Sequence, residues 1–510
     1  MVYKLTGKHL VNGKWIQGTD IFQSAPNTGP SFSFSNPDPG LISKAVNSAS
    51  EAFPEYSNLS RKERANFLRE IATEIEASGD ELTKIATEET GLPDLRIIGE
   101  RGRTVGQLRL FADHIDDEAF LDIRHDYAIP NRKPLPRPDL KLMQISIGPV
   151  AIFGASNFPL AFSTAGGDTA SALAAGCPVI FKGHPSHPGT CEVVAQAILR
   201  AIKTKKINDG VFSLLQGDLH LTGSQLVTHE KIEAVGFTGS LAGGRALFDL
   251  CAGRARPIPF FGEMGSVNPI IFLPEAVAHR SKELTEGWAS SISMGVGQFC
   301  TKPGIGVLYD SQDSDNFIIE LTDQLERVEP QTMLSRNIAN AFEHKCNVLA
   351  KTEGIRELLN SQIDDRKASP RLYETDDTTF LSNPGLKEEI FGPMGLIVRC
   401  SSKKNLNSII ESFQGELTFS IHFEDDEYSA VREILPLLSS KSGRIIANGF
   451  PTGVEVCDSM VHDGPYPAST NFGSTSVGTL AIRRFLRPIC FQNMPDQVLP
   501  EELKKCNLIG

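Results

Sequence analysis

The chain has 510 residues, 40% of them hydrophobic, and a formal net charge of −12, which indicates a well-cored globular protein of roughly two to four domains. Its lysines are scattered and form no stripe that could hold a phosphate backbone, and the first 20 residues contain no apolar run. The sequence therefore argues against nucleic-acid binding, membrane insertion and secretion.

The first half of the chain begins with a helical region and an extended connector. Residues 60–120 are charged, with apolar positions at steps of three and four and Gly91 as a natural stop, which predicts a solvated helical layer. Residues 125–140 carry four prolines and little periodicity, so we expect an arm that leaves the body of the protein and returns.

The remainder reads as α/β. Between residues 144 and 275, apolar strands, glycine turns and amphipathic helices alternate, which predicts a doubly wound parallel sheet whose strand ends gather a ligand. A similar set of elements over 276–460 predicts a second α/β domain. Beyond 465, a loop and a short helix precede a β-rich run that we expect to pair with the connector.

The cysteines predict the cellular compartment of the protein, and one of them stands out. Nine of them are scattered without a C-x-x-C pair or a histidine spacing typical of zinc, so we expect a reducing, cytoplasmic setting and no metal site. Most cysteines in such a protein are small buried hydrophobes. Cys300, in the glycine-punctuated stretch M-G-V-G-Q-F-C-T-K-P-G, needs a separate explanation.

Two stretches could bind phosphate or ribose. Gly239, Ser240 and Gly244 follow a strand and open a helix, where backbone N–H groups and the helix dipole can receive a phosphate. Lys182 ends a buried strand, from which its ammonium could reach ribose or phosphate. The alternatives are a purely structural turn and a lysine that extends from a strand end to water.

Two further positions could act on a carbonyl group. Asn157 lies in a turn between glycine and proline, where its amide could donate to a developing oxyanion or serve the turn itself. Glu263 lies in an apolar, glycine-flanked stretch. Burial there would raise its pKa toward that of a general base, unless an arginine pairs with it.

The order and spacing of these signals resemble the aldehyde dehydrogenase superfamily. Its signatures are N-F-P, a strand-end lysine, F-T-G-S, a glutamate before a glycine, G-Q-x-C and E-E-I-F-G-P, and the chain carries all six in order between about residues 40 and 490. The resemblance implies an aldehyde dehydrogenase-like α/β fold with two doubly wound parallel-sheet domains and a small β oligomerisation arm.

The same resemblance divides the chain and predicts its assembly. A dinucleotide-binding domain would comprise residues 1–124 and 146–263, and a catalytic domain residues 264–464. Residues 125–145 and 465–510 would form the oligomerisation arm and a C-terminal tail, which implies a homodimer or homotetramer.

The resemblance also assigns catalytic roles. Cys300 would be the nucleophile that adds to the aldehyde carbon and makes a thiohemiacetal. The Asn157 amide and the backbone N–H of Cys300 would hold the oxyanion. After hydride transfer to the nicotinamide, Glu263 would activate the water that hydrolyses the thioester.

For the cofactor, Lys182 and Glu389 would hold the two ribose rings, with Phe391 in the same E-E-I-F-G-P motif, and Ser240 would touch phosphate. Many NAD-preferring members carry a glutamate three residues after the lysine, where this chain has Pro185. Losing that acid removes the discrimination against NADP, so we expect NADP or NAD, with NADP favoured. In an NADP-preferring relative a hydroxyl and an arginine hold the 2′-phosphate, and those places align with Pro185 and His220, so we expect no tight selectivity.

The substrate prediction rests on one subgroup, the α-ketoglutaric semialdehyde (2,5-dioxopentanoate) dehydrogenases and a related NADP-preferring fatty aldehyde dehydrogenase. The chain resembles it in F-K-G-H-P, S-L-A-G-G-R-A-L-F, P-Y-P-A-S-T and R-R-F-L-R-P. This implies oxidation of 2,5-dioxopentanoate to 2-oxoglutarate, a reaction that needs a cation for the substrate carboxylate. The helix around residues 99–113 offers Arg103 and Arg109, with Gln107 one turn from Arg103. Alignment with the family favours Arg103 as the anchor, and a helix-surface arginine is the alternative.

Three more residues would border the substrate tunnel. Phe158 and Phe299 would give it aromatic walls, although both could be ordinary core residues. His462 would lie nearby, with a loop histidine that has no catalytic duty as the alternative. Two other functions stay open: oxidation of medium or long aliphatic aldehydes, and a thioesterase or structural dinucleotide-binding protein without hydride transfer.

Overall fold

A computed structural model describes residues 4–361 and 365–504. The first of its two large sheets has the strand order β11-β10-β7-β8-β9-β1-β2. Strands β11 to β9 of this order are parallel, while β1 and β2 add an antiparallel edge. Its strands are β1 (His9–Val11), β2 (Lys14–Ile16), β7 (Val150–Phe153), β8 (Val179–Lys182), β9 (Phe212–Leu215), β10 (Ala234–Thr238) and β11 (Phe260–Glu263). The predicted doubly wound sheet is confirmed.

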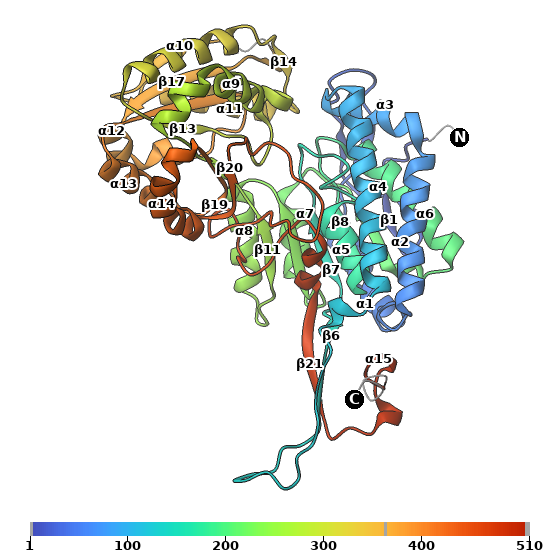
Figure 1. Cartoon of the computed structure of the whole chain (residues 1–510). Coiled ribbons are helices and arrows are strands. Elements are labelled where there is room, and N and C mark those ends of the chain that lie inside the picture. Colours follow the sequence, from blue (N-terminus) through green and yellow to red (C-terminus); the bar gives the residue numbers. More distant parts are fainter. Residues whose placement is uncertain (1–3, 362–364, 505–510) are drawn as a thin grey trace.

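Helices cover both faces of this sheet, and α2, α4 and α6 lie side by side along one margin of the molecule (Figure 1). Its helices are α1 (Pro39–Ser57), α2 (Arg61–Ala77), α3 (Gly79–Thr90), α4 (Asp94–Asp116), α5 (Gly167–Ala175), α6 (Pro188–Lys205), α7 (His220–Thr228) and α8 (Leu241–Ala252). Gly91 ends α3 in the left-handed conformation (φ 76°), as its position in the sequence predicts.

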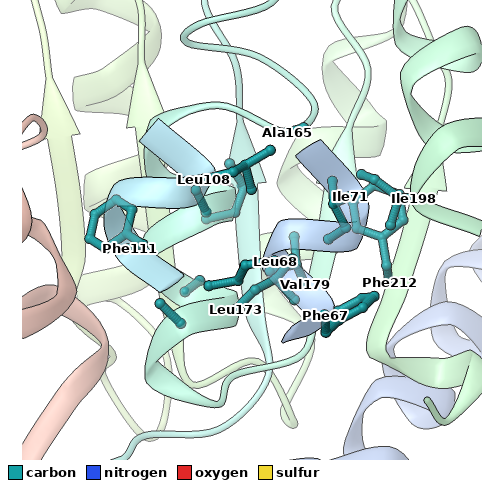
Figure 2. Close-up of a cluster of buried hydrophobic side chains, with 14 of the residues drawn as sticks. Phe67, Leu68, Ile71, Leu108, Phe111, Ala165, Leu173, Val179, Ile198 and Phe212 are labelled. Carbon is teal, nitrogen blue, oxygen red and sulfur yellow. The ribbon is translucent and has the colours of Figure 1, made fainter. Parts of the chain in front are cut away.

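Apolar side chains bind these helices to the sheet. Figure 2 shows Phe67, Leu68 and Ile71 of α2 packed against neighbours from other helices and from strands β8 and β9. Phe67 and Ile71 are fully buried. Burying such a side chain contributes about 1.5–3 kcal/mol, so the helical layer that carries α4 is firmly fixed to the sheet.

The second large sheet has the order β15-β17-β18-β13-β12-β19-β20 and is parallel apart from its edge strand β15. Its strands are β12 (Ile270–Phe272), β13 (Ile305–Tyr309), β15 (Arg356–Leu359), β17 (Arg371–Asp376), β18 (Met394–Cys400), β19 (Glu416–His422) and β20 (Ser442–Ala447). Its helices are α9 (Pro274–Ser293), α10 (Gln312–Glu326), α11 (Arg336–Ala350), α12 (Asp377–Ser382), α13 (Lys403–Ser412) and α14 (Tyr428–Lys441). The second α/β unit is therefore present as predicted.

A narrow antiparallel sheet projects from the rest of the molecule as an arm (Figure 1). It joins β5 (Arg124–Asp126), β6 (Leu140–Ser146) and β21 (Leu486–Gln492) in the order β21-β6-β5. β21 pairs with β6 over its whole length, which confirms the predicted pairing of the connector with the C-terminal strand. Residues 505–510 of the predicted tail lie outside the described residues.

The remaining elements are short. Two small hairpin-like sheets pair β3 (Ile21–Gln23) with β4 (Ser33–Ser35) and β14 (Gln331–Thr332) with β16 (Lys367–Ala368). Short helices are η1 (Ala119–Leu121), η2 (Asp209–Val211), η3 (Met294–Gly297), η4 (Pro384–Lys387), η5 (Asp425–Glu427), η6 (Thr479–Phe485), η7 (Asp496–Val498) and α15 (Glu501–Lys504). Among the described helices, none is long and apolar enough to cross a membrane.

Candidate active site

Three side chains from distant parts of the chain meet between the two large sheets. Glu263 ends β11, Cys300 follows η3, and His462 belongs to the loop after β20. Cys300 Sγ lies 3.3 Å from His462 Nε2, which in turn lies 3.0 Å from Glu263 Oε1. Cys300 is partly exposed, whereas His462 and Glu263 are both buried. A reachable thiol is thus backed by a buried imidazole and a buried carboxylate.

The charges of this cluster support one another. Burial alone would lower the pKa of His462, but Glu263 and then Cys300 raise it to about 10. Burial works to raise the pKa of Glu263, yet the charge of His462 and the hydrogen bond from Ser476 lower this pKa overall. The Ser476 hydroxyl donates to Glu263 Oε2 at 2.5 Å. The expectation of a raised Glu263 pKa is therefore wrong, because an imidazole lies against the carboxylate.

His462 Nε2 lies between the Cys300 sulfur and a Glu263 carboxylate oxygen. Glu263 Oε1 lies within ion-pair distance of Nε2 but makes no hydrogen bond with any described residue. The hydrogen-bond contact of Nε2 is with Cys300 Sγ. A cationic imidazole so placed stabilises the thiolate form of Cys300. The Cys300 sulfur, a His462 ring nitrogen and a Glu263 carboxylate oxygen also lie within 4.8 Å of one another, close enough for a metal ion. That the site holds no metal remains a prediction from the sequence.

The backbone conformation of the turn before Cys300 explains why the turn contains two glycines. Gly295 (φ 55°), Val296 (φ 58°) and Gly297 (φ 63°) are consecutive residues in the left-handed region. Glycine adopts this conformation freely, whereas a β-branched valine is strained there. The surrounding packing must hold Val296, which is buried, so the turn presents Cys300 in a fixed position.

Asn268 holds this turn through side-chain hydrogen bonds, and no sequence pattern pointed to it. Its amide Nδ2 donates to the carbonyl oxygens of Cys300 (2.9 Å) and Lys302 (3.1 Å). Its Oδ1 accepts from Ser266 Oγ (3.1 Å) and Thr418 Oγ1 (3.0 Å). Asn268 is itself in the left-handed conformation (φ 48°) and fully buried. The carbonyl groups of Cys300 and Lys302 are thereby tied, through Asn268, to Ser266 and to Thr418 of β19.

The predicted oxyanion donor lies beside this turn. Asn157 follows β7 and is mostly buried, and its Nδ2 donates to Gln298 O at 2.9 Å. A primary amide has two N–H groups, so one remains for a ligand oxygen. The rings of Phe158 and Phe299, the neighbours of Asn157 and Cys300, meet edge to face at 5.2 Å. The structure thus brings both predicted aromatic residues to the catalytic cluster.

The predicted phosphate-binding turn connects β10 to α8, so it follows a strand and opens a helix as its sequence predicts. Ser240 is the N-cap of α8, and its hydroxyl accepts from Gly243 N at 3.2 Å. A Cβ on Gly239 would lie 2.8 Å from the Phe237 ring, and one on Gly244 2.7 Å from Met264 Sδ. These glycines therefore keep a compact strand-to-helix turn, whose exposed helix N-terminus fits a dinucleotide phosphate.

Three more predicted cofactor residues belong to β8 and to the elements that follow it. Lys182 ends β8, and its Nζ donates to Gly217 O at 2.6 Å. Burial lowers its pKa to about 8. Pro185 is half-buried in the loop that follows, and His220 is exposed as the first residue of α7.

The E-E-I-F-G-P loop approaches from the second sheet. A Cβ on Gly265 would lie 2.5 Å from Glu389 Oε2, so this carboxylate packs against the chain that leaves Glu263. Burial raises the pKa of Glu389 to about 7, against the attraction of Lys302 and then Lys345. Lys302 is buried, and its Nζ donates to Ile390 O (3.0 Å) and Met394 O (3.1 Å). Phe391 lies half-buried in the same loop.

The two candidate substrate arginines, Arg103 and Arg109, lie on different faces of helix α4. Arg109 points to the surface, where it pairs with Glu76 (2.6 and 2.9 Å). Arg103 instead lies over the Phe162 ring at 5.3 Å, and burial lowers its pKa against the attraction of Cys300 and then Glu100. The structure therefore places Arg103, and not Arg109, on the side of the catalytic cluster. Arg96, which the sequence reading missed, also lies there, over the rings of Phe158 (4.4 Å) and Phe299 (4.7 Å).

A buried ion network supports the histidine loop. Arg484 of η6 bonds Asp168 of α5 at 3.0 Å and Asp463 at 2.9 Å. Asp463 follows His462 directly, and all three charged groups are buried. The C-terminal segment therefore fixes the loop that carries the imidazole.

Comparison with known proteins agrees with this geometry. Residues 30–428 match the aldehyde dehydrogenase family. The chain is 45% identical, over 99% of its length and 97% of the relative's, to alpha-ketoglutaric semialdehyde dehydrogenase 2 of Azospirillum brasilense. It is 44% identical, over 98% and 96%, to alpha-ketoglutaric semialdehyde dehydrogenase of Acinetobacter baylyi. An NADP-dependent glyceraldehyde-3-phosphate dehydrogenase of Bacillus halodurans shares the fold, with a TM-score of 0.82, 19% identity and coverage of 96% of this chain and 99% of that one.

Proposed function

The chain belongs to the aldehyde dehydrogenase family, and from this premise we propose that it oxidises 2,5-dioxopentanoate to 2-oxoglutarate with NAD(P). The partly exposed Cys300 thiol, 3.3 Å from His462 and close to Asn157 and Glu263, carries the proposal. The names of the two relatives at 44–45% identity support the substrate.

The first step follows from the contacts of Cys300. His462, whose pKa is raised to about 10, is a cation near neutral pH and holds Cys300 as a thiolate, and the sulfur electron pair forms a bond with the aldehyde carbon. The C=O π electrons move to the oxygen, which becomes an oxyanion. The second N–H of the Asn157 amide and the backbone N–H of Cys300 stabilise that charge, a contribution typically worth about 3–4 kcal/mol for each donor.

A nicotinamide dinucleotide fits the residues at the N-terminus of α8, at the end of β8 and in the E-E-I-F-G-P loop. The α8 N-terminus with Ser240 would receive its phosphates, and Lys182 and Glu389 its riboses. The compact glycine turn at Gly239 and Gly244 keeps this surface clear of side chains. The chemistry that such a cofactor supplies when bound is hydride acceptance. Glu389 lies against Gly265, next to the chain from Glu263, which supports its role near the reacting end.

Hydrolysis of the acyl–Cys300 thioester is the task of Glu263. Its lowered pKa keeps it ionised, so it can accept a proton from water while the water oxygen attacks the acyl carbon. The C–S bond then breaks, and the thiolate leaves toward the His462 cation. The same histidine cation that holds the thiolate before attack thus stabilises the leaving sulfur.

For the cofactor preference we propose that both NAD and NADP are used, with NADP favoured. Pro185 occupies the position of the acid that would repel a 2′-phosphate, which supports this proposal.

We also propose a cytoplasmic homodimer or homotetramer assembled through the arm of β5, β6 and β21. Size-exclusion chromatography with light scattering tests the assembly.

Steady-state reduction of NAD and NADP with 2,5-dioxopentanoate and hexanal tests the function. We expect a higher kcat/KM for the oxo-acid, and a loss of about 2–4 kcal/mol of transition-state stabilisation for it in Arg103→Leu, because the substrate carboxylate loses its cation. Equal or better turnover of hexanal would show a medium-chain aldehyde dehydrogenase instead. The absence of any absorbance change at 340 nm with every aldehyde would exclude hydride transfer.

A further inference from the structure

A second pair of cysteine and histidine lies outside the catalytic cluster, at the start of helix α6. His187 is the N-cap of this helix, and Cys191 lies four residues further along the chain. Cys191 Sγ lies 3.4 Å from His187 Nδ1, and both side chains are fully buried. A buried thiol cannot reach a substrate, so the role of this pair lies in the groups that it contacts.

The second ring nitrogen of His187 contacts the turn that carries Asn157. His187 Nε2 lies 3.1 Å from the carbonyl oxygen of Ala155, two residues before Asn157. A carbonyl oxygen only accepts hydrogen bonds, so this contact needs a proton on Nε2. Cys191 keeps that proton there, because its S–H donates to Nδ1 of a neutral ring and its thiolate accepts from Nδ1 of a cationic one. In both protonation states the Nε2–H group therefore donates to Ala155.

The same pair contacts the other end of this turn. The Ser163 hydroxyl oxygen lies 3.8 Å from Cys191 Sγ, within hydrogen-bond distance for sulfur. The backbone closes the segment between these two contacts, since Ala155 N donates to Phe162 O at 2.9 Å. The cysteine and the histidine thus hold both ends of the 155–163 loop.

Helix α4 holds the middle of this loop. Glu100 Oε1 accepts from the backbone N–H groups of Leu160 (2.8 Å) and Ala161 (2.9 Å). Within the described chain, His187 is the one side chain that donates to the Ala155 carbonyl. Without that donor the buried carbonyl would favour rotation of its peptide group toward another partner, and the asparagine amide two residues further on would move with it.

We propose that His187 and Cys191 are positioning residues for the Asn157 amide: they fix the 155–163 loop so that this amide donates to the oxyanion that forms when Cys300 attacks. The inference rests on the proposed function, because it assumes the oxyanion role of Asn157. An oxyanion donor acts only within about 3 Å of the charged oxygen, and a misplacement of about 1 Å can lower a rate about 100-fold. A hydrogen bond two residues away can therefore govern the rate.

Steady-state kinetics with 2,5-dioxopentanoate tests the His187 contact. His187→Leu removes both ring nitrogens, and we expect kcat to fall about tenfold. Attack on the aldehyde and attack on the thioester both place negative charge on the same oxygen, so KM for the aldehyde should change less than about twofold. The Kd for NADH should also stay close to that of the wild type. His187→Gln, whose amide can donate in place of Nε2, should recover most of kcat.

Cys191 is tested by its own pair of substitutions. Cys191→Ala leaves Nδ1 free to take the ring proton, so kcat should fall, though less than in His187→Leu. Cys191→Ser keeps a donor and an acceptor beside Nδ1 and should recover the lost activity. Cys177→Ala is the matched control and should leave kcat unchanged, because Cys177 is another fully buried cysteine whose thiol donates to Phe485 O at 3.4 Å.

A double-mutant cycle separates positioning from packing. Asn157→Ala alone should lower kcat about 100-fold. When His187→Leu is added to it, kcat should fall less than about twofold further, because the amide that His187 positions is already gone. A trifluoromethyl ketone gives the same cycle without hydride transfer: the Cys300 sulfur bonds the carbonyl carbon, and the C=O electrons move to the oxygen. The Ki of this ketone should rise by the same factors as kcat falls.

The outcomes separate the two proposals. If His187→Leu lowers kcat by the same factor with and without Asn157, or if His187→Gln is no faster than His187→Leu, the pair is a packing element and the inference is overturned. If His187→Leu does not fold, the same cycle with Cys191→Ala and Cys191→Ser decides between these results. An unchanged kcat in Asn157→Ala alone would refute the proposed oxyanion role of Asn157 itself.

Discussion

His462 Nε2 lies 3.3 Å from Cys300 Sγ and 3.0 Å from Glu263 Oε1, so one imidazole joins the nucleophile to the carboxylate that would activate water. Each neighbour raises the pKa of His462, and His462 in turn lowers that of Glu263. The two halves of the reaction, thiol activation and thioester hydrolysis, are therefore electrostatically coupled through this histidine.

Replacing His462 with asparagine should shift the pH dependence of the reaction. Glu263 stays buried but loses the charge that lowers its pKa, so this pKa rises. Because water activation needs the carboxylate form and follows acylation, the acid limb of kcat should move to higher pH, and kcat should fall about 100-fold. A pH–rate profile measures both effects, with His279→Asn, an exposed histidine on α9, as the control. An unchanged acid limb would show that His462 does not govern the charge of Glu263.

Replacing Glu263 with glutamine should separate the two half-reactions. The amide keeps the side-chain size but cannot accept a proton, so acylation of Cys300 proceeds while hydrolysis slows by about 100-fold or more. Stopped-flow absorbance should show a burst of NAD(P)H, and intact mass should show an acyl adduct. Cys300→Ala should give neither. Slow turnover of Glu263→Gln without a burst or adduct would place Glu263 before acylation instead.

Replacing Lys302 with methionine should weaken cofactor binding. The variant leaves the carbonyls of Ile390 and Met394 without their donor and removes the cation that lowers the pKa of Glu389. Glu389 would then be more protonated near neutral pH, and the Kd for NADH should rise about tenfold, recovering in part as the pH is raised. Fluorescence titration without aldehyde measures this.

Two further variants give the Lys302 experiment its controls. Lys302→Gln restores a hydrogen-bond donor but not the positive charge. It should therefore bind NADH more tightly than Lys302→Met, and its Kd for NADH should still fall as the pH is raised. Lys141→Met removes another buried lysine, which pairs with Asp496 in the arm, and should leave the Kd unchanged. Equal weakening by Lys141→Met would mean that any buried lysine matters through stability alone.

Local patterns predicted the residues whose role depends on their own stretch of sequence. Cys300, Asn157 and Lys182 each follow a strand or turn that the pattern of apolar residues and glycines already defines. The alternation of strands and helices likewise predicted both parallel sheets. Such signals extend over about ten residues and located the elements, whereas the roles of these three residues came from the family resemblance and stay predictions.

The rest of the site depends on contacts between distant segments, which a single sequence does not encode in any short pattern. Cys300 and His462 are 162 residues apart, and Asn268 and Thr418 are 150 apart. The same limit explains the wrong pKa direction for Glu263, because burial was visible in its apolar neighbours while the imidazole was not. For Arg103 and Arg109 the helix was evident, but only Glu76 on α2 shows which one faces the surface.

Replacing Arg484 with methionine should destabilise the protein in a pH-dependent way. Arg484 bonds Asp168 and Asp463 in the interior, and burial already raises the pKa of both carboxyls, against the attraction of this arginine. Without Arg484, two buried carboxylates lose their counter-charge, which costs about 3–5 kcal/mol. Both groups bind protons more tightly in the folded than in the unfolded state, so folding stability rises as the pH falls through their folded-state pKa values. The loss in Tm of Arg484→Met relative to wild type should therefore be largest at neutral pH and shrink in acid. Arg483→Met, an exposed neighbour, is the control, and a loss in Tm that is equal at every pH would show that Arg484 acts through packing and not through its charge.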